Sequence, residues 1–218
     1  GYLLTIILGG LILFVLLFFF EKTGNLAWLY SWGIIGLFMI LIQPLFTTVI
    51  SPMFNKFTPL EEGKLRTNIE NYTKKVKFPL SRIDVMDGSR RSSKSNAYFS
   101  GFGKQKRIAL FDTLIEKHSN EEMVAILAHE VGHYKKHHIK IGLLISILHT
   151  GILFWLLSLF IDNPGLFEAF KMEISNYAGF TFFMILYSPI ELVISVFMNA
   201  LSRRNEFQAD SYSAETTK

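Results

Sequence analysis

The chain has 218 residues, of which 50% are hydrophobic and 21 are phenylalanine. It has no cysteine, which excludes disulfides and thiolate metal ligands, so a zinc site would have to use nitrogen and oxygen. The net charge of +4 requires no nucleic-acid partner, because a membrane protein concentrates Lys and Arg on one side of the bilayer.

The apolar residues form long blocks, and four of these are long enough to cross a bilayer. A hydrocarbon layer of about 30 Å requires about 20 helical residues. The first block lacks a basic leading region and a cleavage site, so it indicates a membrane anchor rather than a signal peptide. The sequence therefore predicts a mainly α, multi-span helical membrane protein. The expected spans are Tyr2–Phe20, Leu26–Ile50, Gly142–Ile161 and Ala178–Ala200.

The expected domains follow from these spans. Residues 1–50 hold two transmembrane helices, and residues 142–200 hold two more, joined by the short loop 162–177. Between them, residues 51–141 are polar enough and long enough for a small zincin-like α+β catalytic insertion. Residues 201–218 continue the last helix beyond the membrane.

Charge predicts the orientation in the membrane. Four spans place both chain ends and residues 51–140 on one side, and every Lys and Arg except Lys22 and Lys171 lies on that side. Cytoplasmic loops carry the excess of basic residues, although the rule weakens for long segments. We therefore expect an integral, multi-pass protein whose catalytic side is cytoplasmic and whose partner is the lipid bilayer.

The insertion changes its pattern along the chain. Leu60–Lys77 has helical periodicity, whereas Arg82–Asp87 and Lys106–Phe111 are typical of short strands. The aromatic segment Asn96–Gly103 (NAYFSGFG) predicts an edge strand whose backbone could pair with an extended peptide, and an ordinary hairpin arm fits it equally well. The substrate-binding candidates within it are Asn96, Ala97, Tyr98 and Phe99.

A helix with two spaced histidines follows. Ser119-Asn120-Glu121-Glu122 is a capping-box start. Four residues turn a helix by about 400°, so His129 and His133 share one face and can grip one zinc ion, while Glu130 stays free to face a water. The alternative is a surface helix with polar residues.

Two neighbouring histidines are expected to be bystanders. His137 lies about 12 Å along the helix axis from His129, which is too far for both to bind one ion. We expect His137 and His138 to be solvated beside Lys135, Lys136 and Lys140 as a basic approach to the membrane.

A third ligand must come from elsewhere, and the last helix offers one. Glu206 and Asp210 are four residues apart on one helical face, so a carboxylate ligand and a supporting carboxylate can point the same way. The alternative is a charged helix face that leaves the membrane beside Arg203 and Arg204.

These motifs, taken in order, resemble one known family. HEVGH, followed by SRRNEFQAD and preceded by NAYFSGFGKQKRIALFDTL and PMFNKFTPLEEG, is similar to the type I CAAX prenyl proteases, integral-membrane zinc endopeptidases of the glutamate-zincin kind. The resemblance implies that one Zn²⁺ per chain is bound by His129, His133 and Glu206, with Glu130 as catalytic base and Asp210 supporting the site. It also implies that the partner is the prenylated C-terminus of another protein or peptide, from which the three residues after the lipid-bearing cysteine are removed.

The sequence also departs from the family pattern. Family members have about seven membrane helices, so four spans indicate a central fragment. The histidine that contacts the substrate carbonyl in that family is expected beyond Lys218. Two rival functions stay open: a membrane quality-control zinc protease, and a non-catalytic membrane scaffold with a structural zinc. A structural zinc normally has four protein ligands, and three are found here, which favours catalysis.

Two polar residues within the spans are the last candidates. Glu191 could line a water-filled cavity or pack as a hydrogen-bonded carboxyl between helices, and the two readings are equally open. His149 is expected to be a packed or hydrogen-bonded residue rather than a ligand, because it lies about 24 Å of helix beyond His133.

Overall fold

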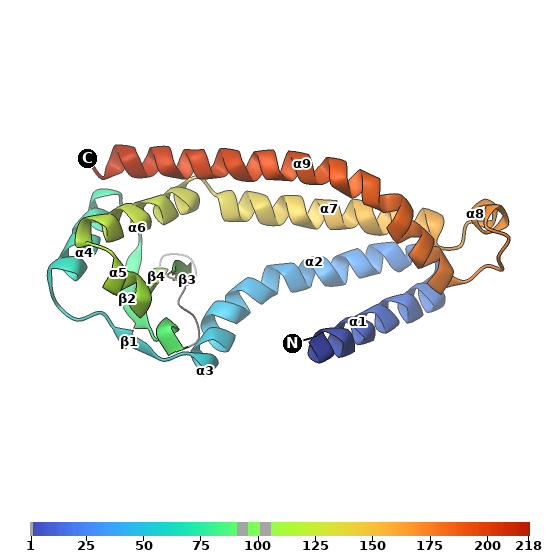
Figure 1. Ribbon diagram of the computed structural model, residues 1–218, viewed down its shortest axis with the longest axis horizontal. Helices are drawn as coiled ribbons and strands as arrows, with labels where there is room; N and C mark the ends of the chain where they lie inside the picture. The colour runs from blue at the N-terminus through green and yellow to red at the C-terminus, as the bar shows by residue number, and fades with distance from the viewer. Residues whose placement is uncertain (1, 91–95, 101–105) are drawn as a thin grey trace. The chain divides into compact units, whose positions relative to one another are not determined.

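The computed structural model describes residues 2–90, 96–100 and 106–218 (Figure 1). It divides into two compact units, which we call the helical unit (Gly1–Met39 and Gly142–Asn199) and the sheet unit (Ile40–Ile141 and Ala200–Lys218). The predicted fold class is confirmed, because the chain is mainly α-helical with one small mixed sheet.

Apolar side chains on both the inside and the outside characterise the helical unit. A cluster that includes Phe20, Phe154 and Leu157 is buried between its helices. Leu192 and Phe197 are nevertheless 68% and 71% exposed, as expected of helix surfaces that face lipid rather than water. The helices that contribute to this unit are α1 (Tyr2–Thr23), α2 (Ala27–Leu45), α7 (His138–Phe160), α8 (Pro164–Ala169) and α9 (Asn176–Thr216).

Close contacts join α2 to α7. The Trp32 indole nitrogen donates a hydrogen bond of 2.7 Å to the Ile147 carbonyl. A Cβ on Gly151 would lie only 2.9 Å from that nitrogen, so glycine makes room for the indole. Small residues of this kind let membrane helices approach each other closely.

Three helical stretches of the described residues are long and apolar enough to cross a membrane: Ala27–Phe54, His138–Phe160 and Asn176–Thr216. The first contains Pro44, whose missing N–H interrupts the regular helical bonding. The chain continues through a π-helical turn at Phe46–Ile50 into the short helix α3 (Ser51–Phe54). The expected span Tyr2–Phe20 falls within α1, and its role as a span stays a prediction.

The sheet unit contains a four-stranded sheet with the order β1-β2-β4-β3. β2 and β4 are parallel, whereas β1 and β3 pair antiparallel at the two edges. The strands predicted at Arg82–Asp87 and Lys106–Phe111 are confirmed within a residue or two. The strands are β1 (Phe57–Pro59), β2 (Leu80–Met86), β3 (Ala97–Ser100) and β4 (Lys106–Phe111).

The helix expected at Leu60–Lys77 is shorter than predicted. It is α4, Lys64–Lys75, because the Leu60 N–H still bonds to the Ile83 carbonyl of β2 at 3.0 Å. That bond holds Leu60 in an extended conformation beside the sheet.

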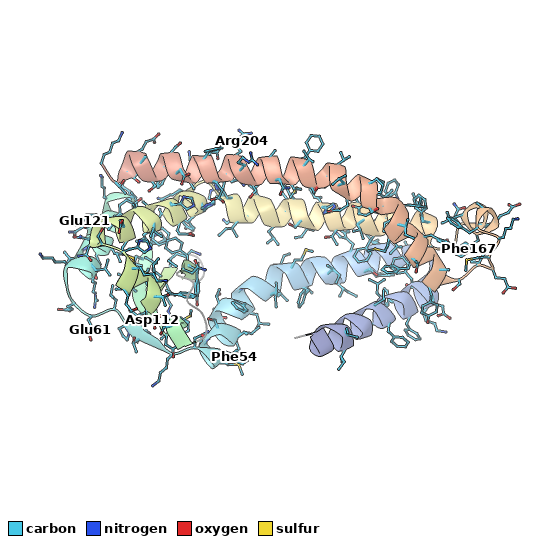
Figure 2. The ribbon with its side chains drawn as sticks, in the orientation of Figure 1. Phe54, Glu61, Asp112, Glu121, Phe167 and Arg204 are labelled. Atoms are coloured by element: carbon cyan, nitrogen blue, oxygen red, sulfur yellow. The ribbon has the colours of Figure 1, made fainter. Side chains whose placement is uncertain are left out.

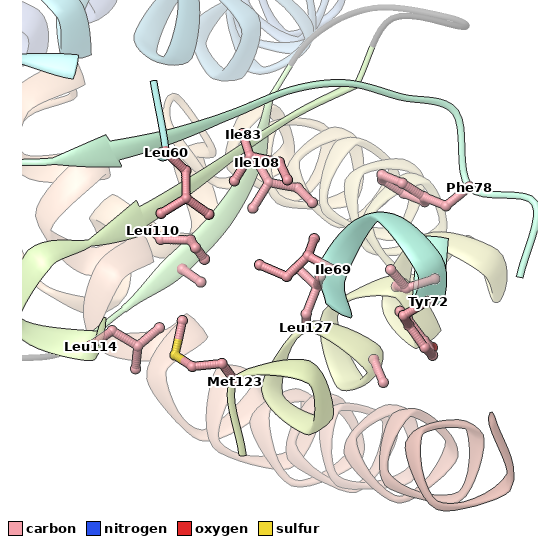
Figure 3. Close-up of a cluster of buried hydrophobic side chains, with 13 residues drawn as sticks. Leu60, Ile69, Tyr72, Phe78, Ile83, Ile108, Leu110, Leu114, Met123 and Leu127 are labelled. Atoms are coloured by element: carbon pink, nitrogen blue, oxygen red, sulfur yellow. The ribbon is translucent and has the colours of Figure 1, made fainter. Parts of the chain in front are cut away.

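The core of the sheet unit lies between the sheet and three helices (Figure 3). Ile69 of α4, Ile108 of β4 and Leu127 of α6 are almost completely buried there. This core fixes the position of α6, the helix with the two motif histidines. Besides α4, the helices that enclose this core are α5 (Asp112–Lys117) and α6 (Asn120–Lys135).

A buried ion cluster joins the parallel strands. The Asp84 carboxylate is fully buried and pairs with Arg82 at 2.6 Å and with Arg107. The Arg107 guanidinium also lies over the Phe57 ring of β1, 4.3 Å from its centroid. A buried carboxylate with two cationic partners is satisfied rather than reactive, so we assign it to the sheet and not to chemistry.

Candidate metal centre

α6 begins with the predicted capping box. The Ser119 hydroxyl accepts a hydrogen bond of 3.2 Å from the Glu122 N–H, and the Glu122 carboxylate accepts one of 2.8 Å from the Ser119 N–H. One face of the helix, including Met123 and Val131, is buried in the core. The spacing of four then leaves His129 and His133 together on a half-buried face.

The C-terminal part of α9 packs directly on α6 (Figure 1). A Cβ on Gly132 would meet the Ala209 Cα at 3.0 Å, so this contact requires a glycine. The Ser213 hydroxyl donates to the Ala125 carbonyl at 2.9 Å, one helical turn away. These contacts fix the position of Glu206, which precedes Ala209 by three residues.

Three ligand atoms converge where the helices meet. His129 Nε2 lies 3.0 Å from His133 Nε2 and 3.3 Å from Glu206 Oε2. His133 Nε2 lies 3.6 Å from the same oxygen. Atoms bound at about 2.0–2.1 Å to a tetrahedral zinc are about 3.3–3.4 Å apart. The predicted ligands His129, His133 and Glu206 are therefore brought together with the spacing of one zinc coordination sphere.

The tautomer of His129 also favours a cation between His129 and Glu206. Its Nδ1 lies 2.8 Å from Asp210 Oδ1, and a carboxylate only accepts hydrogen bonds. The hydrogen of neutral His129 therefore lies on Nδ1, which leaves the Nε2 lone pair directed at Glu206. A lone pair facing a carboxylate oxygen is repulsive unless a positive charge lies between them. The donor set, two imidazole nitrogens and one carboxylate oxygen, is one that zinc prefers.

Glu130 lies beside this cluster, partly buried. Burial raises the pKa of Glu130, the charge of His129 lowers it, and the charge of Glu206 raises it further. A raised pKa is what a carboxylate needs if it is to accept and return a proton near neutral pH. Burial also lowers the pKa of His133, which favours the neutral imidazole that a metal requires.

The expectation for His138 was wrong. His137 is exposed as predicted, but His138 is only 7% exposed and lies against the site. His138 Nδ1 is 3.0 Å from His133 Nδ1, and His138 Nε2 is 3.0 Å from Gln208 Oε1. Neither His138 nor Gln208 was predicted as part of the site from the sequence. Helical periodicity could not find His138, because α6 ends at Lys135 and His137 adopts a left-handed φ of 60° before α7 begins.

The candidate substrate strand lies at the edge of the sheet. Asn96 precedes β3, and Ala97, Tyr98 and Phe99 belong to it. Within the described residues, no strand pairs with its outer side. The Phe111 N–H donates to the Asn96 carbonyl at 3.1 Å. Residues alternate along an antiparallel ladder, so the backbone groups of Tyr98 face β4, and those of Ala97 and Phe99 face outward.

Side chains anchor this strand. The Tyr98 hydroxyl is hydrogen-bonded to the Ser51 hydroxyl of α3 at 3.0 Å. The Phe99 ring packs on Phe78 with centroids 4.8 Å apart. The Asn96 side chain accepts the Ala97 N–H at 2.9 Å. The described part of Asn96–Gly103 ends at Ser100, so the rest of that predicted segment lies outside the described residues.

His149 and Glu191 meet in the helical unit. His149 Nε2 lies 2.9 Å from the Tyr187 hydroxyl and 3.2 Å from Glu191 Oε2. The prediction that His149 is hydrogen-bonded is confirmed. For Glu191, this contact places the carboxyl between α7 and α9, but its Oε2 is buried without a hydrogen-bond partner among the described residues, so both interpretations of Glu191 stay predictions.

The chain is similar to known proteins along almost its whole length. The family model for peptidase family M48 matches residues 59–218, and that for the CAAX prenyl protease N-terminal region, five membrane helices, matches residues 1–56. CAAX prenyl protease 1 of Saccharomyces cerevisiae is 39% identical over 94% of this chain and 49% of that protein. The human CAAX prenyl protease 1 homolog is 34% identical over 94% of this chain and 51% of that protein.

A solved structure is similar as well. The crystal structure of S. mikatae Ste24p matches with a TM-score of 0.82 and 37% sequence identity, over 98% of this chain and 54% of that chain. The chain thus spans about half the length of the relatives it matches.

Proposed function

The chain belongs to peptidase family M48, and we propose that it carries the catalytic centre of a zinc-dependent membrane endopeptidase that removes the C-terminal tripeptide from prenylated proteins. One observation carries this proposal. His129 Nε2, His133 Nε2 and Glu206 Oε2 converge at 3.0 to 3.6 Å from one another, with Glu130 beside them. Three protein ligands leave the fourth position of a tetrahedral zinc open, which is the arrangement of a catalytic site.

The residues divide the chemistry between them. When bound, zinc would lower the pKa of a water toward about 7 and polarise the scissile carbonyl. Glu130 would accept the proton of the attacking water and deliver it to the nitrogen of the leaving peptide, so that the amide bond breaks without charge building up on either fragment. Asp210 holds the His129 ring through Nδ1 and fixes its direction.

The edge strand supports binding of an extended peptide. The outward carbonyl of Ala97 and the outward N–H and carbonyl of Phe99 can pair with a substrate strand, and main-chain pairing of this kind tolerates varied side chains. The four residues Asn96 to Phe99 would then position the scissile bond. The relatives that match along almost the whole chain are named CAAX prenyl proteases, which supports a prenylated C-terminus as the bound peptide.

The membrane helices support the same substrate. A prenyl chain partitions into lipid, so an enzyme that meets it must work at the bilayer. The excess of Lys and Arg on the side of residues 51–140 supports a cytoplasmic catalytic side. The exposed Arg204 on α9 belongs to that excess (Figure 2).

The test is cleavage of a farnesylated CAAX peptide and of its unprenylated twin by the purified full-length protein. We expect release of the tripeptide from the farnesylated peptide at a rate at least about tenfold higher, because the lipid contributes binding free energy for each buried methylene. Equal cleavage of both peptides, or preferred cleavage of unfolded membrane proteins, would favour the quality-control alternative. A protein that binds zinc but cleaves none of these substrates would favour the scaffold.

A further inference from the structure

His138 has a setting that a bystander histidine would not need. It is the first residue of α7, yet its ring turns back toward α6 and is almost completely buried. Both of its nitrogens have partners: Nδ1 faces His133 Nδ1, and Nε2 faces Gln208 Oε1, each at 3.0 Å. The left-handed backbone at His137 makes this possible, because it ends the helical run and redirects the next residue.

The donor and acceptor of each of these two hydrogen bonds follow from the chemistry of the groups. His133 Nε2 is the nitrogen that faces His129 and Glu206. An imidazole that binds a metal through Nε2 carries its hydrogen on Nδ1. His133 Nδ1 therefore donates to His138 Nδ1, which must then accept. The hydrogen of His138 lies on Nε2, and it is donated to Gln208 Oε1, which is an acceptor. Each of the two donors in this series, His133 Nδ1 and His138 Nε2, therefore meets an acceptor.

The two ligand histidines thus have different supports. His129 is held by Asp210, a charged carboxylate whose side chain is 66% exposed. His133 is held by a neutral, largely buried imidazole, which is in turn held by an amide. Only the first support was evident from the sequence.

We propose that His138 and Gln208 are positioning residues for the metal site, fixing the tautomer and ring orientation of His133 by accepting its Nδ1 hydrogen. This inference rests on the proposed zinc site. It requires an acceptor at the place of His138 Nδ1 rather than a histidine as such. Supports of this kind typically contribute 10- to 100-fold to metal affinity.

The test is Zn²⁺ affinity of the full-length protein by chelator competition, with the visible spectrum of the Co²⁺ form as a second readout. His138→Leu fills the space without an acceptor, and we expect its Zn²⁺ affinity to fall about 10- to 100-fold. His138→Asn places an amide oxygen near the former Nδ1, and we expect it to restore most of the affinity and the Co²⁺ spectrum. His137→Asn, at the exposed neighbour, removes that imidazole but keeps a residue type that tolerates the left-handed backbone, so it is the matched control and should leave both unchanged.

A variant at Gln208, the last residue of this series of hydrogen bonds, keeps the inference testable if His138→Leu misfolds. Gln208→Leu leaves His138 in place but removes its partner, and we expect a smaller loss of Zn²⁺ affinity with an altered Co²⁺ spectrum. If His138→Leu does not fold, Gln208→Leu and His138→Asn decide the matter. Zinc-binding wild-type protein together with unchanged affinity in the folded variants would overturn this inference alone. A wild-type protein that binds no zinc would overturn the proposed function as well.

Discussion

Gly132 of α6 and Ala209 of α9 approach so closely that a Cβ on Gly132 would lie 3.0 Å from the Ala209 Cα and 3.2 Å from its carbonyl oxygen. The contact is with backbone atoms, which cannot rotate away as a side chain can. Gly132 lies between the two motif histidines, and Ala209 lies three residues after Glu206. The approach of the two helices is therefore what brings the carboxylate to the imidazoles.

Gly132→Ala should weaken metal binding without touching a ligand. The added methyl group would push α9 away by a few tenths of an ångström and lengthen the gap between Glu206 and both histidines. We expect Zn²⁺ affinity to fall about tenfold, by the same loss of orientation that follows from changes around a metal site. Gly142→Ala is the control, because nothing lies within 4 Å of a Cβ there. Equal Zn²⁺ affinity in both variants would show that the contact between α6 and α9 accommodates the added methyl group without moving Glu206.

Glu206 and Asp210 should differ in the kind of loss they cause. Glu206→Ala removes a ligand, so zinc occupancy and activity should fall together. Asp210→Ala removes only the partner of His129 Nδ1, so Zn²⁺ affinity should fall about 10- to 100-fold while stoichiometry at high zinc is retained. Chelator competition measures the Zn²⁺ affinity of each variant, and peptide cleavage measures its activity. Wild-type affinity in Glu206→Ala would remove Glu206 from the site.

The edge strand should respond to proline in an alternating manner. Proline lacks the N–H, and the Phe99 N–H faces outward, so Phe99→Pro should impair peptide cleavage. Phe99→Leu keeps the N–H and controls for loss of the ring. Ala97→Pro should be milder, because the Asn96 side chain already occupies that N–H. Tyr98→Pro should disrupt the pairing with β4 and the fold itself.

Cleavage rates should be compared only for variants with full zinc content and wild-type melting behaviour. Undiminished activity in folded Phe99→Pro would mean that the peptide binds elsewhere.

The start of α6 should contribute to stability. Ser119→Ala removes the acceptor for the Glu122 N–H, which costs about 0.5–2 kcal/mol of unfolding free energy in comparable caps. The exposed Ser202→Ala serves as control. The hydrogen bond from the Ser119 N–H lowers the pKa of Glu122, so the stability that this bond contributes is present above the unfolded pKa and is lost as pH falls through the folded one. Glu122→Gln should flatten that acid limb in thermal melts, and an unchanged limb would contradict the assignment.

Local patterns predicted the two histidine ligands, the carboxylate pair Glu206 and Asp210, and the cap of α6, but not the residues that support His133. His129 and His133 follow from a helical spacing, and the cap at Ser119 follows from a four-residue motif, so both are encoded within one segment. Glu206 and Asp210 also share a face, although only the resemblance to a known family linked them to the distant histidines. His138 and Gln208 could not be found, because their contact depends on a helix break at His137 and on the packing of α9. Neither feature leaves a periodic pattern of residue types in the sequence.

Two of the four strands, β2 and β4, could be predicted from local composition. β2 and β4 are parallel and rich in apolar residues, and the central part of each is buried, so their composition marks them clearly. The length of α4 was overestimated, because its charges continue the helical pattern into residues that the sheet holds extended at Leu60. Which edge of the sheet stays open depends on strand order, and that order involves pairings between distant segments.

The most direct test of the zinc-peptidase assignment is the Glu130→Gln variant of the full-length protein, measured for zinc content and peptide cleavage in the same preparation. The ligands are untouched, so we expect one zinc per chain, as in wild type. Glutamine cannot accept the proton of the attacking water, so cleavage of a farnesylated peptide should fall by about 10²- to 10⁴-fold. Cleavage near the wild-type rate by Glu130→Gln protein with stoichiometric zinc would contradict the proposed mechanism.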